Sequence, residues 1–282
     1  MKRYCVLLFA FALNLNLFAD SPATNPDIQL RVNSYYDLAN KAMAFTQEPQ
    51  SRLPMLIAAT LLALDFDKNL RGLDFYEPID LVATYNPNSI NRYYMVLTPK
   101  EKMPVGQVKF SGRNLFAKEL QGKYILSNSS AYLPGSLPKA ITDSENDVII
   151  RLNKSFFQKS FPLGQESPLV SELKQIEKLL IRGSIVKDNL ELTLVIDSSD
   201  PALLERVNKL VSNNNSFLTA LLGGFTPEEQ LDIKKVMVPQ INELKGNRLT
   251  IKYSLPKSLV LSFIPKKYRF REKTQKRVHF QF

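Results

Sequence analysis

The chain has 282 residues and is basic, with 37 Lys and Arg residues against 27 Asp and Glu residues and a net charge of +10 at pH 7. This length is enough for one large domain or two small ones. Because the chain has only one cysteine and one histidine, its composition excludes a disulfide framework, a cysteine-bound metal and any metal site that needs several histidines.

Residues 1–19 have the pattern of a secretory signal peptide. Two basic residues precede an apolar run over 4–13, and the small residue Ala19 ends the segment. The run is too short to span a bilayer but fits the apolar core of a cleaved signal. We therefore expect an exported protein, periplasmic or extracellular. The only cysteine, Cys5, falls inside this segment, so the mature chain is expected to be free of cysteine.

A seven-residue motif occurs twice, at Asp27–Asn33 and Asp147–Asn153, with a constant offset of 120 residues. Both copies share the Asp, an Arg at the fifth position and the final Asn, with aliphatic residues at the second, fourth and sixth positions. A Ser and two aromatic residues follow each copy, and the pattern changes from strand character to helical spacing. The internal repeat predicts two related halves, each opening with a strand that leads into a helix.

Further along the first half, turn residues separate short apolar runs. The patterns predict a strand over 28–32, a helix over 35–45, a very apolar core helix over 55–64, and strands over 79–85, 93–97, 105–110 and 123–127.

The second half repeats this plan after a boundary near residues 141–146. Its patterns predict a strand over 148–152, a helix over 169–180 and a hairpin of 181–186 with 190–196. Two helices follow, one from Pro201 to 211 capped by Asp200 and one over 226–244 that starts at the capping residue Thr226. A strand over 249–255 and a strand-like run over 259–264 end the half.

Helices and strands are interspersed, and many neighbouring strands have the spacing of hairpins. No Gly-rich strand-to-helix turn occurs. We therefore predict an α+β protein of two related halves, each a mostly antiparallel sheet packed with helices. The expected boundaries are 20–143 for the N-terminal half, 144–265 for the C-terminal half and 266–282 for a basic tail.

The chain also loosely resembles uncharacterised secreted bacterial proteins built from two such halves. The resemblance rests on the run Arg31-Val32-Asn33-Ser34, on Gly72-Leu73-Asp74 leading into 78–81, and on the hairpin and helix of 181–211. It covers most of the mature chain and implies the layout and the exported location. It implies no activity.

Candidate catalytic and metal-binding groups are sparse. The single histidine, His279, lies in the basic tail, and the pattern Ser-x-x-Lys occurs four times without the companion motifs of Ser-Lys enzymes. Residues 65–69 resemble the start of a calcium loop, but Leu70 replaces the required Gly and Tyr76 replaces the closing Glu. The apolar cluster over 217–225 is typical of a short packed helix or of a lipid-facing segment. We assign no catalytic, cofactor or metal residue.

The tail over 266–282 holds most of the net charge. Aromatic and aliphatic residues alternate there with seven basic residues: Lys266, Lys267, Arg269, Arg271, Lys273, Lys276 and Arg277. A solvated edge strand is one interpretation. The functional interpretation is electrostatic docking onto anionic envelope lipid, polysaccharide or an acidic protein. Nucleic acid is not expected as a partner of an exported protein.

These observations lead to one main hypothesis and two alternatives. The main hypothesis is a cell-envelope protein of unknown function that acts as a non-catalytic binding or scaffold module. The first alternative is a periplasmic carrier of an apolar or lipid-like ligand, which requires an apolar cavity of several hundred Å³. The second is a hydrolase using carboxylates or a Ser-Lys pair, which requires such groups to converge in a cleft with shifted pKa values.

Overall fold

The computed structural model describes residues 26–47, 54–55, 57–58, 71–85, 92–110, 113–139, 141–160, 174–212 and 239–262. Several features singled out in the sequence lie outside these ranges: the signal peptide, the calcium-like loop over 65–69, the cluster over 217–225, Thr226 and the tail with His279. Each described helix is too short or too polar to span a membrane.

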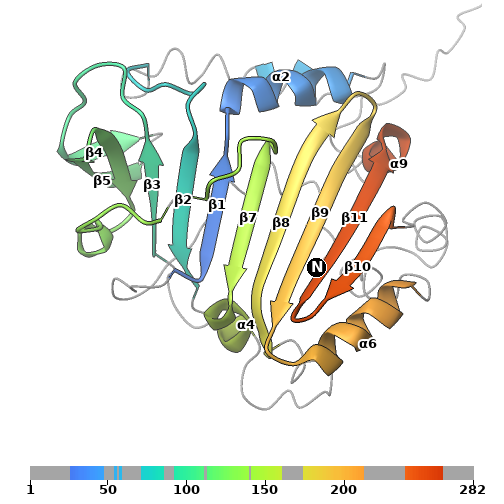
Figure 1. Ribbon diagram of the computed structural model, residues 1–282. Helices are drawn as coiled ribbons and strands as arrows, with labels where there is room; N and C mark the ends of the chain where they lie inside the picture. Colours follow the sequence, from blue (N-terminus) through green and yellow to red (C-terminus); the bar gives the residue numbers. More distant parts are fainter. Residues whose placement is uncertain are drawn as a thin grey trace, which may run out of the picture.

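The described residues form one continuous eleven-stranded sheet whose neighbouring strands all pair antiparallel (Figure 1). The predicted α+β class with mostly antiparallel pairing is confirmed. The two predicted halves do not form a sheet each, because their strands join side by side. In spatial order the strands are β10 (Ile241–Lys245), β11 (Arg248–Pro256), β9 (Asn189–Ser198), β8 (Ile176–Val186), β7 (Val148–Asn153), β1 (Ile28–Val32), β2 (Ile79–Thr84), β3 (Arg92–Leu97), β6 (Lys123–Ser127), β5 (Arg113–Leu120) and β4 (Gly106–Phe110).

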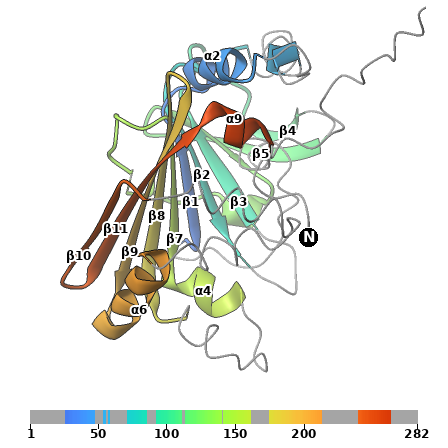
Figure 2. The ribbon, with the colours of Figure 1, turned by 90° about the vertical axis from the view of Figure 1, so that its right-hand side faces the viewer.

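The described α-helices lie at the ends and on one face of this sheet. Helix α2 (Tyr35–Phe45) follows β1 directly and lies across one end of the sheet (Figure 1). Its start is capped by Ser34, whose hydroxyl accepts a hydrogen bond from the Asp37 backbone N–H at 3.2 Å. In Figure 2, helices α4 (Lys154–Ser160), α6 (Pro201–Ser212) and α9 (Lys257–Ser262) lie on the same side of the C-terminal strands.

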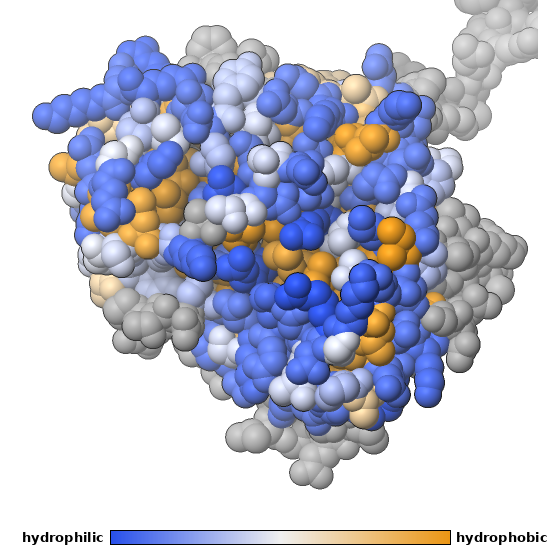
Figure 3. Space-filling model, in the orientation of Figure 1, coloured by the Kyte–Doolittle hydropathy of each residue, from blue (hydrophilic) through white to orange (hydrophobic). Residues whose placement is uncertain are grey.

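Three clusters of buried apolar side chains hold the layers together. Helices α4, α6 and α9 pack against β8, β9 and β11, where Leu203, Leu204 and Ile251 are fully buried. A second cluster lies on the same face of β3, β5 and β6, under the 73–75 and 103 region. The third lies on the opposite face of β2, β3 and β6, under Tyr132 of η1 (Ser130–Tyr132). The sheet is therefore buried on both faces near β3 and β6. Figure 3, in the orientation of Figure 1, shows a largely hydrophilic surface with scattered apolar patches.

The two copies of the repeated motif lie side by side at the middle of the sheet. Strand β1 pairs antiparallel with β7, and Leu30 lies directly opposite Ile150, its counterpart in the other copy. This register places the two copies about a local two-fold axis, and several contacts from one copy to the other have a counterpart in the reverse direction. We call the paired segments Asp27–Asn33 and Asp147–Asn153 the central seam.

The ends of the central seam are closed by two matching sets of hydrogen bonds from asparagine. The Asn33 backbone N–H donates to the Asp147 carbonyl at 3.1 Å, and the Asn153 backbone N–H donates to the Asp27 carbonyl at 2.9 Å. The side-chain amide of Asn33 donates to the Asn146 carbonyl, and that of Asn153 donates to the Pro26 carbonyl, both at 2.6 Å. Both motif asparagines therefore stop their strand by bonding to the backbone just before the other copy.

The motif aspartates anchor the neighbouring strands and helices in the same reciprocal way. The Asp27 carboxylate is fully buried and accepts from the Tyr85 backbone N–H and from Lys159 of α4, each at 2.7 Å. The carboxylate of Asp147 accepts from the Ile185 backbone N–H at 2.9 Å and from Lys41 of α2 at 2.6 Å. Each aspartate thus binds a lysine from the helix that follows the other copy.

Most predicted strands are present, and three predictions need correction. Residues 176–180 belong to β8 and not to a helix, because a bulge between Ile176 and Lys178 disturbs the alternation that marks a strand. Residues 241–245 form the edge strand β10 and not the end of a helix. The run after Pro256 is helix α9, which buries Leu259. Strand β5 was not predicted. In the predicted helix over 55–64 only 55 and 57–58 are described, and these residues are helical.

Replacing Asp27 by Ala should lower the free energy of unfolding by about 1–3 kcal/mol, because a buried backbone N–H and a lysine lose their acceptor. The matched control is Glu205→Ala, which removes a carboxylate from an exposed position of α6. Urea denaturation of both variants measures the difference. Equal unfolding midpoints would contradict a stabilising role for the Asp27 carboxylate.

Candidate functional site

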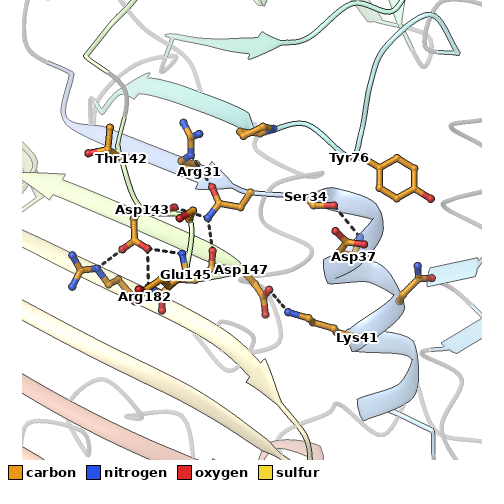
Figure 4. A pocket seen from close by; sticks show the side chains of 15 residues that line it. Arg31, Ser34, Asp37, Lys41, Tyr76, Thr142, Asp143, Glu145, Asp147 and Arg182 are labelled. Carbon is orange, nitrogen blue, oxygen red and sulfur yellow. Dashed lines mark hydrogen bonds and ion pairs between the residues drawn. The ribbon is translucent and has the colours of Figure 1, made fainter.

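A hollow of about 1160 Å³ opens beside α2, at one end of the central seam (Figure 4). We call it the α2 hollow. Four parts of the fold build it: the end of β1 with the first turns of α2, the segment 76–78 before β2, the segment 142–147 before β7, and Arg182 of β8. Its lining residues are nearly all polar: Arg31, Asn33, Ser34, Asp37, Asn40, Lys41, Tyr76, Pro78, Thr142, Asp143, Ser144, Glu145, Asn146, Asp147 and Arg182.

The basic side chains of the α2 hollow are all engaged in ion pairs. Each cation meets a carboxylate that comes from a different strand or loop. The three pairs are Arg31 with Asp80 at 3.0 Å, Lys41 with Asp147 at 2.6 Å, and Arg182 with Asp143 at 2.7 Å. The charges therefore hold the walls of the hollow together, and they leave its cationic groups already neutralised.

Asp143 holds the segment 142–147 in its folded shape. Its carboxylate accepts from the Asn146 side-chain amide at 3.0 Å and from the Glu145 backbone N–H at 3.2 Å, while Arg182 lies beside it. Burial of the Asp143 carboxyl tends to raise its pKa, but these hydrogen bonds and the arginine outweigh that effect and hold the pKa below its usual value. The Asp143 carbonyl accepts from Asn33, which joins the segment to the central seam.

Asp80 is shifted in the opposite direction. Its carboxylate accepts two hydrogen bonds from the Arg31 guanidinium, at 3.0 and 3.1 Å. Burial raises the pKa of Asp80 more than the charge of Arg31 lowers it, so the pKa lies above its usual value. Arg31 also donates to the Asn33 side-chain oxygen at 2.8 Å, which orients the asparagine within the wall.

An exposed aromatic ring stands at one side of the α2 hollow. Tyr76 is 58% exposed, although its ring lies 4.8 Å from that of Tyr36 at an interplanar angle of 30°. The Tyr76 backbone N–H donates to the Asp74 carboxylate at 3.1 Å, which fixes the local turn. Figure 4 shows Tyr76 on the side of Ser34 and Asp37. The ring is thus held in place while much of its surface stays in contact with solvent.

None of the sequence-predicted candidates that the structure describes lines the α2 hollow. All seven basic residues of the tail lie outside the described residues. Of the Ser-x-x-Lys serines, Ser184 accepts from the Asp147 backbone N–H at 3.2 Å, and Ser254 donates to Glu191. Within the part of the chain that the structure describes, no group of three acidic, histidine or cysteine side chains is arranged to hold a metal ion.

Sequence reasoning missed the α2 hollow, although part of its signal was present. Arg31 and Asn33 are two of the three polar residues that both copies of the repeated motif share. Polar residues at fixed positions of an apolar strand indicate a role besides packing. Arg182, Asp143 and Tyr76 had no such signal, because each lies in a separate segment and acquires its neighbours only in the folded sheet.

Comparison with known proteins places the chain near one group of solved structures. No protein-family model and no curated protein sequence matches it. Three crystal forms of the Treponema protein TP0453 are similar. Form IV has a TM-score of 0.40 and 10% sequence identity, and the match covers 86% of this chain and 94% of that chain. Form III has a TM-score of 0.38 and 10% identity, with 87% of this chain and 98% of that chain covered. Form I has a TM-score of 0.35 and 8% identity, with 88% of this chain and 96% of that chain covered. These similarities are consistent with the loose resemblance to uncharacterised bacterial proteins.

The lowered pKa of Asp143 predicts a specific pH dependence of stability. A carboxyl whose folded pKa lies below its unfolded value stabilises the fold above the unfolded pKa of 3.8 and loses that contribution as the pH falls through the folded pKa. The stability advantage of the native chain over Asp143→Asn should therefore shrink as the pH is lowered from about 6 to about 3. Urea denaturation of both proteins across this range measures it. A constant difference would contradict the assignment.

Proposed function

We propose that this protein is an exported, non-catalytic binding or scaffold module of the cell envelope, and that the α2 hollow is its binding surface. The signal peptide expected over 1–19 supports export. The observation that carries the proposal is the pairing of Arg31, Lys41 and Arg182 with carboxylates. These ion pairs produce a polar, preorganised surface, because each charged side chain is held in place by its partner.

The electrostatics of the α2 hollow favour binding over hydrolysis. A general acid or base works best when its pKa lies near the operating pH. The pKa of Asp143 is shifted away from neutrality. The pKa of Asp80 is raised, but both of its carboxylate oxygens accept hydrogen bonds from Arg31. Ser184 and Ser254 hydrogen bond within the sheet, which does not favour a Ser-Lys hydrolase.

The lining of the α2 hollow also favours a polar ligand over an apolar one. A carrier of a lipid-like ligand needs a continuous apolar cavity. Among the lining residues only Pro78 is aliphatic and only Tyr76 is aromatic. The apolar side chains of the described sheet pack against helices and loops in the three clusters. The tail over 266–282 is proposed as a separate contact to an anionic envelope component, through its seven basic residues.

A bulky side chain placed in the α2 hollow should prevent the protein from binding its envelope partners. Ser144 is exposed and lines the hollow, so Ser144→Trp should block it without disturbing the core. Ser136→Trp places the same bulky side chain at an exposed position that does not line the hollow. Affinity purification of each exported variant, followed by mass spectrometry, should show components that the native chain and Ser136→Trp retain and Ser144→Trp loses. Identical sets of components would refute the α2 hollow as the binding surface.

We also propose that the two halves are related copies of one ancestral unit. The reciprocal bonds of the central seam support this, because Asp27 and Asp147 each bind a lysine from the other copy's helix. The direct opposition of Leu30 and Ile150 supports it as well. Closed two-fold contacts are the commonest arrangement of paired identical units, and a duplicated chain retains that geometry.

If the copies are equivalent, their asparagines should contribute similarly to stability. Asn33→Ala and Asn153→Ala should each lower the free energy of unfolding by about 1–2 kcal/mol, because each leaves a partly buried carbonyl just before the opposite copy without its donor. Asn40→Ala, at an exposed position of α2, is the control. Urea denaturation measures all three variants. A large loss for one motif asparagine with none for the other would argue against equivalent roles.

A further inference from the structure

We infer that the α2 hollow binds a neutral, hydroxyl-rich ligand, a saccharide unit of the cell envelope, which stacks on the exposed ring of Tyr76. This inference rests on the proposed function, because it names the class of ligand that the same hollow takes. Charge, aromatic exposure and the arrangement of polar groups each support it.

The charge of the α2 hollow argues against an anionic ligand. An anionic ligand would need a cation that is free to pair with it, whereas Arg31, Lys41 and Arg182 are already paired within the fold. The lining holds four carboxylates against these three cations, so its own charges nearly cancel. A neutral polar ligand can bind here without separating any of these ion pairs.

The exposure of Tyr76 argues for a ligand with an apolar face. A tyrosine ring offers a large apolar area, and its burial is normally favourable. Tyr76 leaves 58% of its surface exposed while its ring is supported by Tyr36 and its backbone by Asp74. A rigid ring costs little conformational entropy on binding. The C–H groups on one face of a pyranose ring stack on such a surface, and the sugar hydroxyls remain free for polar contacts.

The polar groups beside the ring suit hydroxyl groups. Sugar hydroxyls both donate and accept, so they pair with side-chain amides, hydroxyls and carboxylates. Asp37 and the side-chain amide of Asn40 lie in the first turns of α2, at exposed positions in the lining of the hollow. In the view of Figure 4, Asp37 and Tyr76 are drawn on the same side of the hollow, and both line it. A sugar stacked on Tyr76 would therefore meet acceptors and donors along α2.

The experiment uses the full mature chain and three neutral probes: maltotetraose, cellotetraose and chitotetraose. Binding is measured by calorimetry, and contact by saturation-transfer NMR. We expect at least one probe to bind, Tyr76→Ala to weaken that binding about tenfold or more, and Tyr76→Phe to retain it because the stacking surface is kept. Val105→Ala, which trims an exposed apolar residue outside the lining, should bind like the native chain. Thermal unfolding of each variant shows that it is folded.

The outcomes separate this inference from the proposed function. If no probe binds, or if Tyr76→Ala binds as tightly as the native chain, the saccharide inference is wrong. Should Ser144→Trp still lose envelope components in that case, the α2 hollow remains a binding surface for another class of ligand. Should Ser144→Trp lose nothing as well, the proposed function fails together with the saccharide inference.

Discussion

The pairing of β1 with β7 is the constraint on which the rest of the structure depends. Asp27 and Asp147 are the ends of this pairing, and each carboxylate accepts from a backbone N–H of the next strand and from a lysine of a helix. A shift of one residue in this pairing would move every side chain to the opposite face of the sheet. It would also leave the buried carboxylate of Asp27 without donors. The reciprocal polar bonds therefore specify the register more than they add to the net stability.

The position of the α2 hollow follows from that register. Asn33 ends β1 and donates to two carbonyls of the segment before β7, which pulls that segment toward the start of α2. Lys41 of α2 then reaches Asp147, and Arg182 of β8 reaches Asp143. The same contacts that end the central seam therefore form the walls of the hollow. Moving one of these walls would break the hydrogen bonds and ion pairs that end the central seam.

Apolar and polar side chains lie in different parts of the fold and have different roles. Apolar clusters on both faces near β3 and β6, and on one face of β8, β9 and β11, supply the burial that drives folding. The polar residues gather where the strands end, at Asn33, Asp143 and Asp147. Because the ends of strands leave backbone groups without sheet partners, polar side chains there satisfy the backbone and face solvent at once. A surface for a hydrophilic ligand at this place fits both requirements.

Local patterns of the sequence determined the strands and helices whose conformation follows from the spacing of their own apolar residues. Alternation predicted β1 and β11, helical spacing predicted α2 and α6, and the two copies of Asp27–Asn33 and Asp147–Asn153 were visible directly. Only the tertiary structure decided that these copies pair with each other, that the described strands share one sheet, and that Arg182, Asp143 and Tyr76 surround one hollow. The edge strand β10 and the bulged start of β8 belong to the same category. Hydrogen bonds between distant strands select these arrangements, and no local spacing of residues encodes which strands will meet.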